Sequence, residues 1–235
     1  MKTRVVSVHE HDVSIVASHV IKSGGVVAYP TETAYAIGCS ALNHDAAKKV
    51  FSLKQRHLSK PLPVIMASKA MAAEYLRFTP GVEKLISHFM PGPLTIVAPK
   101  TGKLIYAGDM ESLAFRISSN LFARELSLLS SAPIVSTSAN ISGFEPVYEI
   151  SKIIELFDGK VDLIVSGGDL DPKATSTIVD LTGKKPKILR EGPIKKAAVL
   201  KVLKGGGRVG STKGKIGKKA HKSSRAKSTR RKKRR

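Results

Sequence analysis

Short runs of β-branched and aliphatic residues alternate with amphipathic stretches along residues 1–204, and this alternation most constrains the fold. Runs of this length and composition are typical of strands. The predicted strands lie at residues 26–29, 94–97, 114–117, 133–136, 163–165, 176–179 and 187–189. Strands that alternate with amphipathic helices predict an α/β fold, a twisted sheet with helices packed on it.

The stretches between the strands carry helix start and stop signals. Apolar residues recur at helical spacing in the first stretch, and Gly24 follows it as a stop. Asn43 can cap a second helix, and Thr79 can cap a third that begins with Pro80. Further helices are predicted at residues 121–129, 150–157 and 194–203.

The composition changes at residue 204, where the apolar periodicity stops. Of the formal charge of +22, residues 205–235 carry +14 without any acidic residue, which leaves +8 on residues 1–204. A Gly, Ser, Lys and Arg segment with few apolar residues cannot bury enough surface to order itself, so we expect a disordered basic tail. The excess positive charge favours polyanionic partners such as nucleotides, RNA or acidic membrane surfaces.

Other features restrict the class of protein. No apolar run approaches the roughly 18 residues that a membrane span needs, and the first residues lack the apolar region of a secretory signal. The single cysteine, Cys39, cannot form an internal disulfide. We therefore expect a cytoplasmic protein without a membrane partner.

Two segments combine polar residues with the end of a predicted element. The first places Thr31, Glu32 and Thr33 just after a strand, which is typical of a turn whose side chains cap the next element. The second places Lys54, Arg56 and Lys60 within seven residues at a helix end. These cations are either solvated charges that complement the helix dipole or a clamp for a triphosphate.

Two further segments suggest a ligand site. An apolar strand runs directly into residues 136–143, which are rich in hydroxyl and amide groups, and such strand ends bind ligands in α/β sheets. Alternatively, Ser138 or Asn140 caps the helix near Tyr148. The strands near residues 176–180 and 187–192 each carry polar residues, although Arg190 alone would be an ordinary surface charge.

In order and spacing, these segments resemble the YrdC-like family of threonylcarbamoyl-AMP synthases. The resemblance covers about residues 9–203. It rests on the phrases PTET–Y–G at 30–38, K-x-R at 54–56, PGPLT at 91–95, FR at 115–116, S-x-S-A-N-x-S-G at 136–143, STIVD at 176–180 and L-R-x-G at 189–192. The family has an open α/β fold around a twisted mixed sheet with flanking helices and a concave basic face.

The resemblance implies that L-threonine, bicarbonate or carbon dioxide, and ATP give threonylcarbamoyl-AMP and pyrophosphate. The product serves the N6-threonylcarbamoyladenosine modification of tRNA at position 37. Lys54 and Arg56 would form the catalytic clamp, and the ATP contacts would be Arg56, Lys60, Ser138, Asn140 and Arg190. The threonine pocket would consist of Thr33, Arg116, Ser136 and Ser176.

The resemblance also implies partners, namely tRNA or double-stranded RNA on the basic face and tail, and a downstream threonylcarbamoyl transferase. Mg²⁺ would arrive with ATP, because the sequence shows no dedicated metal-ligand motif. Three positions depart from the family pattern: Lys60 replaces an asparagine, Ile65 replaces a histidine, and Ala36 adds a methyl group to a Y-G-L-G phrase.

Two other functions remain open at this stage. A non-catalytic protein of the same fold could bind double-stranded RNA or the ribosome, with the basic tail contacting phosphates. A related domain could instead transfer a carbamoyl group from carbamoyl-adenylate to a different acceptor.

Overall fold

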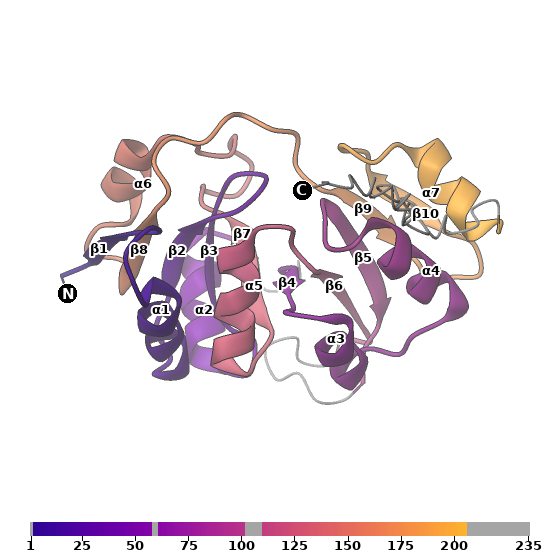
Figure 1. The fold of residues 1–235 in the computed structure, drawn as a ribbon, viewed down its shortest axis with the longest axis horizontal. Coiled ribbons are helices and arrows are strands. Elements are labelled where there is room, and N and C mark those ends of the chain that lie inside the picture. The colour runs from indigo at the N-terminus through magenta and orange to yellow at the C-terminus, as the bar shows by residue number, and fades with distance from the viewer. Residues whose placement is uncertain (1, 58–60, 102–109, 206–235) are drawn as a thin grey trace, which may run out of the picture.

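The computed structural model describes residues 2–57, 61–101 and 110–205, which form ten strands and seven helices (Figure 1). The strands are β1 (Arg4–Ser7), β2 (Val27–Pro30), β3 (Tyr35–Ser40), β4 (Val64–Ile65), β5 (Leu94–Pro99), β6 (Ser112–Arg116), β7 (Ile134–Ser138), β8 (Leu163–Ser166), β9 (Thr177–Asp180) and β10 (Lys187–Arg190). The helices are α1 (Val13–Lys22), α2 (His44–Leu53), α3 (Lys69–Tyr75), α4 (Pro80–Phe89), α5 (Leu121–Ser130), α6 (Ile150–Phe157) and α7 (Lys196–Leu203). No helix in this part of the chain has the length and apolar character to span a membrane.

All ten strands belong to one sheet, in the order β1-β8-β2-β3-β7-β4-β6-β5-β9-β10. The pairs β1–β8, β2–β8, β4–β6 and β5–β9 are parallel, and the other neighbours are antiparallel. The expectation of a mixed α/β sheet with flanking helices is therefore confirmed.

Two apolar cores lie against the sheet. The smaller core joins α1 and α5 to side chains such as Tyr29 and Ile134 of the strands beneath them. The larger core joins α2, α3, α4, α6 and α7 to the strands, with Phe115 and Ile37 among its buried members. In Figure 1, α4 and α7 lie near β5, β9 and β10 at one end of the sheet, while α1, α2 and α5 lie near β2, β3 and β7.

The predicted strands and helices are all present, with ends that coincide or differ by up to two residues. Asn43 caps α2 by accepting a hydrogen bond from the Ala46 amide at 3.0 Å, and Thr79 caps α4 in the same way. The capping role considered for Ser138 and Asn140 is wrong. Ser138 lies within β7, and the residue preceding α6 is Glu149, which makes no side-chain cap.

Four elements, β1, β3, β4 and α3, were not predicted from the sequence. Every residue of β3 is buried, so this strand lacks the alternation that marks a half-exposed strand. β4 has only two residues, and α3 has seven, which is short for a periodic signal. Residues 206–235, which contain all but the first residue of the predicted tail, lie outside the described residues.

Candidate functional site

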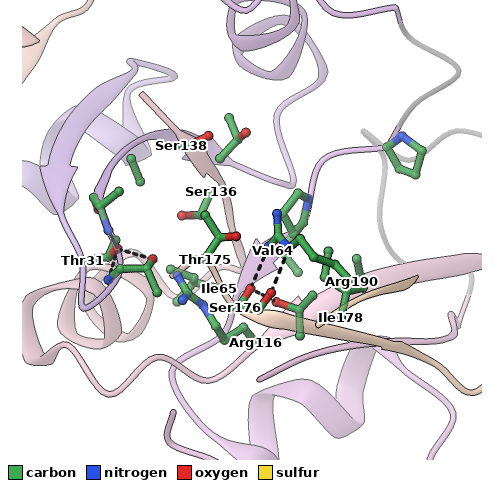
Figure 2. A pocket seen from close by; sticks show the side chains of 18 of the residues that line it. Thr31, Val64, Ile65, Arg116, Ser136, Ser138, Thr175, Ser176, Ile178 and Arg190 are labelled. Atoms are coloured by element: carbon green, nitrogen blue, oxygen red, sulfur yellow. Dashed lines mark hydrogen bonds between the residues drawn. The ribbon is translucent and has the colours of Figure 1, made fainter. Parts of the chain in front are cut away.

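A cavity of about 540 Å³ opens beside β4, where polar ends of several strands meet (Figure 2). Because β4 pairs only through Val64 and Ile65, residues 136–138 of β7 continue past its end. The cavity is lined by every predicted site residue in the described part of the chain: Thr33, Lys54, Arg56, Arg116, Ser136, Ser138, Asn140, Ser176 and Arg190. The remaining predicted residue, Lys60, lies outside the described residues.

On one side of the cavity, Arg116 lies at the end of β6. Its guanidinium Nη1 donates to Glu32 Oε1 at 3.0 Å, and the Ser118 hydroxyl donates to Glu32 Oε2. The Arg116 side chain is only 10% exposed, yet it lines the cavity. A buried planar cation in such a wall suits a planar carboxylate.

The turn between β2 and β3 supplies Thr31 and Thr33. The Thr31 hydroxyl donates to the Ala34 carbonyl at 2.7 Å and accepts from the Thr33 amide at 3.2 Å, so Thr31 stabilises the turn itself. The interpretation of this segment as a turn is thus correct for Thr31. Thr33 lines the cavity as well, 3.1 Å from the Thr31 hydroxyl.

Ser136 of β7 is held by Tyr29 of β2. The Tyr29 hydroxyl donates to Ser136 Oγ at 2.8 Å, which leaves the Ser136 proton able to donate to a ligand. Burial raises the pKa of Tyr29, so this phenol remains a protonated donor at neutral pH.

Arg190, the last residue of β10, and Ser176, the residue before β9, form a second polar group. Arg190 Nε donates to the Ser176 carbonyl at 2.9 Å, and its Nη2 donates to Ser176 Oγ at 3.2 Å. Figure 2 shows Arg116, Ser176 and Arg190 facing the same cavity. Burial, and then the charge of Arg116, lower the pKa of Arg190, which indicates that two cations share this space.

Thr95 is a polar cavity residue that was not predicted from the sequence. Its hydroxyl lies within hydrogen-bond distance, at 2.8 Å, of the Oγ of Ser176, the residue before β9, and it lines the cavity. Thr95 is the last residue of the PGPLT phrase. The motif therefore included this residue, but a motif alone does not show which side chain it contacts.

Lys54 is buried at 2% exposure, so its interpretation as a solvated charge is wrong. Its Nζ donates to the Ser138 carbonyl at 2.7 Å, the Asn140 carbonyl at 2.7 Å and Asn140 Oδ1 at 2.8 Å. An ammonium has three protons, and these three acceptors use them all. Burial, followed by the charge of Arg56, lowers the pKa of Lys54 to about 8.

Lys54 therefore shapes the turn that follows β7. Asn140 Oδ1 also accepts from Ser138 Oγ at 2.6 Å, and Asn140 Nδ2 donates to the Phe144 carbonyl. Arg56, two residues after Lys54, is half-buried and donates to the Pro61 carbonyl at 3.1 Å. Burial lowers the pKa of Arg56.

The lining as a whole suits anions. Among the described residues that line the cavity there are three guanidinium groups, one ammonium and several hydroxyls, but no carboxylate. Within residues 2–57, 61–101 and 110–205, no group of three or more His, Cys, Asp and Glu side chains is arranged to hold a metal ion. Guanidinium groups and hydroxyls bind carboxylates and phosphates.

Two of the three departures from the family pattern can be located. Ile65 is buried in β4, directly beside Arg116 in the parallel register. Ala36 lies in β3 opposite Ser138. Both residues line the cavity, so apolar groups occupy these two positions of its wall.

The chain matches a known protein family. A family model for Sua5, YciO and YrdC proteins, described as "Telomere recombination", matches residues 19–192 of this chain. This chain belongs to the Sua5/YciO/YrdC family. The matched range contains every described residue of the cavity lining, from Thr31 to Arg190.

Individual members of the Sua5/YciO/YrdC family agree with this assignment. A threonylcarbamoyl-AMP synthase of Pyrococcus abyssi is 35% identical over 191 residues, which are 80% of this chain and 56% of the relative. The crystal structure of P. abyssi Sua5 complexed with L-threonine is similar with a TM-score of 0.79 at 33% identity, over 86% of this chain and 61% of that one. This chain thus spans little more than half the length of these relatives.

Escherichia coli YciO shows the fold at its shorter length. Its crystal structure is similar with a TM-score of 0.73 at 23% identity, over 83% of this chain and 96% of that one. The open sheet and its helices are therefore common to short and long Sua5/YciO/YrdC proteins.

Proposed function

We propose that this protein is an L-threonylcarbamoyladenylate synthase, which makes threonylcarbamoyl-AMP and pyrophosphate from L-threonine, bicarbonate or carbon dioxide, and ATP. One observation carries the proposal. Arg56, Arg116 and Arg190 come from distant parts of the chain and line a single cavity together with the hydroxyls of β7 and Ser176. The volume of about 540 Å³ lies in the range of small-molecule sites.

Arg116 would receive the carboxylate of L-threonine through its unused N–H groups. Within the described residues, Glu32 is the only hydrogen-bond partner of the Arg116 guanidinium, and it engages Nη1 alone. Thr33, Ser136 and Ser176 would supply hydroxyls for the substrate amine and side chain. The similar P. abyssi Sua5 was crystallised with L-threonine, which supports this assignment.

The phosphates of ATP would lie toward Arg56, Ser138 and Arg190, with Lys60 as a further candidate. Lys54 and Asn140 would act here by fixing the turn after β7, because their polar atoms are already bonded to protein. Mg²⁺ would enter with ATP and be held mainly by the phosphates, since no described residue of the cavity lining carries a carboxylate.

The reaction needs positioning and charge neutralisation more than a covalent nucleophile. The threonine amine and bicarbonate would form a carbamate and release water. A carbamate oxygen would then attack the α-phosphorus, the bond to the bridging oxygen would break, and pyrophosphate would leave. The guanidinium groups of Arg56 and Arg190 would stabilise the charge that develops on the phosphate oxygens.

The product would serve the modification of tRNA in the cytoplasm, through a downstream threonylcarbamoyl transferase. The basic tail and basic surface would keep the enzyme close to RNA. These partners follow from the charge of the chain and from the proposed product.

The experiment that tests this proposal is pyrophosphate release from ATP, with and without L-threonine and bicarbonate. Release should require both co-substrates and should fall at least about 100-fold in Arg56→Ala. RNA binding by Arg56→Ala should remain within about twofold of wild type, because the tail supplies most of the charge. RNA binding without any threonine-dependent release would support the non-catalytic alternative, and release with another amine would support a different acceptor.

A further inference from the structure

Glu32 contacts a cavity residue but has no role in the reaction proposed above. It lies in the turn between β2 and β3, and its two carboxylate oxygens accept from Arg116 Nη1 and from the Ser118 hydroxyl. The side chains of Arg116 and Glu32 are 10% and 16% exposed. A shielded ion pair of this kind is held more firmly than a surface pair.

Glu32 could affect ligand binding in two opposite ways. It could occupy the place of a substrate carboxylate and compete with it, or it could hold Arg116 from behind. The residues that line the cavity include Thr31, Thr33 and Arg116, but Glu32 is not among them. This position favours support over competition.

The far side of Glu32 is fixed by a rigid element. Ser118 is fully buried, and its Oγ also accepts a hydrogen bond from the Asn120 amide at 3.2 Å. Asn120 caps α5 by accepting from the Ala123 amide at 3.0 Å. The carboxylate of Glu32 is therefore tied to the start of a helix, and it transmits that fixed position to Arg116.

Arg116 would be poorly restrained without this carboxylate. Within the described residues its guanidinium has no other hydrogen-bond partner, and it shares the cavity with Arg56 and Arg190. A flexible cation in this position could turn toward any bound anion, including a phosphate of ATP.

We propose that Glu32 is a positioning residue for the amino-acid substrate. Its carboxylate fixes the Arg116 guanidinium so that the free N–H groups face the cavity and receive the carboxylate of L-threonine. This inference rests on the proposed function and adds to it a residue that does not contact the substrate.

Glu32→Gln tests the inference, because it preserves the size of the side chain and one acceptor oxygen but removes the charge. By isothermal titration calorimetry, the Kd for L-threonine should rise about tenfold or more, while the Kd for ATP should change less than about twofold. L-threoninol lacks the carboxylate, so its Kd should be equal in wild type and Glu32→Gln.

The matched control is Glu83→Gln, which removes an exposed glutamate whose Oε1 lies 3.5 Å from Lys69 Nζ. It should bind L-threonine like wild type. Glu32→Asp keeps the charge at shorter reach, and it should recover part of the lost affinity. This second variant also provides a measurement if Glu32→Gln does not fold.

Three results would overturn the inference. Tighter L-threonine binding by Glu32→Gln would show that the carboxylate competes with the substrate. Equal weakening for L-threonine and L-threoninol would show a general effect on the cavity, and unchanged binding of both would show no role. In each of these cases wild type still binds L-threonine, whereas failure of the proposed function would appear as wild type binding neither L-threonine nor ATP.

Discussion

The basic side chains of the cavity differ in how many of their donors remain for a ligand. Lys54 donates all three protons to protein oxygens, whereas Arg116 donates to Glu32 through one guanidinium nitrogen. The sequence motifs predict a direct role at the site for both residues, but the hydrogen bonds separate them. We interpret Lys54 as a structural support of the site and Arg116 as a ligand contact.

Lys54→Met should destabilise the protein. The change keeps most of the side-chain volume but leaves the acceptors of Ser138 and Asn140 without their buried partner, at a cost of about 2–4 kcal/mol. The measurement is the free energy of urea unfolding. The control is the exposed Lys48 of α2, the helix that ends just before Lys54, and Lys48→Met should change stability by less than about 0.5 kcal/mol.

A different result would reassign Lys54. If Lys54→Met unfolds at the same urea concentration as wild type but loses ATP binding, then the ammonium contacts phosphate directly. The interpretation of Lys54 as a support would then be wrong.

The buried thiol of Cys39 should cause a loss of stability at alkaline pH. Burial raises the pKa of its thiol from 9.0 to about 12 in the folded protein. Between these values the unfolded chain binds fewer protons than the native one, so this group lowers the unfolding free energy as pH rises. The slope approaches about 1.4 kcal/mol per pH unit above pH 9.

The test is urea unfolding of wild type and Cys39→Ala at pH 8, 9, 10 and 10.5. Above pH 9, the unfolding free energy of wild type should fall relative to that of Cys39→Ala by about 1.4 kcal/mol per pH unit. The loss of packing in Cys39→Ala is independent of pH and therefore offsets the curves without changing their slopes. Parallel curves would contradict the prediction.

At the scale of elements, the β3–β7 pair determines where the polar end of β7 lies. β3 runs antiparallel to β7 with Gly38 opposite Ser136 and Ala36 opposite Ser138. A Cβ atom on Gly38 would lie 2.2 Å from the Val135 carbonyl oxygen, closer than atoms can approach. The glycine therefore permits the close contact of two strands that position the cavity hydroxyls.

Gly38→Ala should destabilise the protein by more than about 3 kcal/mol, because the backbone of β7 would have to move. Thermal unfolding measures the effect. Gly183→Ala is the control, since the nearest described atom to a Cβ there is the Lys185 carbonyl oxygen at 3.9 Å, and it should shift stability by less than about 0.5 kcal/mol. Equal melting temperatures for both variants would contradict this account of Gly38.

At the scale of the whole molecule, charge is divided between two parts of the chain. Residues 205–235 carry +14 and residues 1–204 carry +8. The described residues that line the cavity all belong to the second part, between Thr31 and Arg190. This separation predicts that RNA attraction and substrate binding can be removed independently.

Deletion of residues 205–235 should weaken RNA binding and reduce its dependence on salt, because the shortened protein neutralises fewer RNA phosphates. Threonine-dependent pyrophosphate release should stay within about twofold of the full chain. The two measurements are RNA affinity at several salt concentrations and the release rate. Loss of release on deletion would place the tail in the active site and would move the boundary that we predict at residue 204.

The sequence by itself determined the fold class, seven of the ten described strands, six of the seven described helices and nine of the polar residues that line the cavity. Local periodicity and capping residues specify elements such as α2 and α4, and polar motifs at the strand ends mark the site. These signals are local, so they can be read along the chain.

Only the tertiary structure decided which polar groups meet. Glu32 and Arg116 are 84 residues apart, and Thr95 and Ser176 are 81 residues apart, yet each pair is within hydrogen-bond distance. It also showed that Lys54 is buried and bonded to the turn after β7. Such contacts depend on the order of strands in the sheet, which places distant segments side by side and leaves no periodic trace in the sequence.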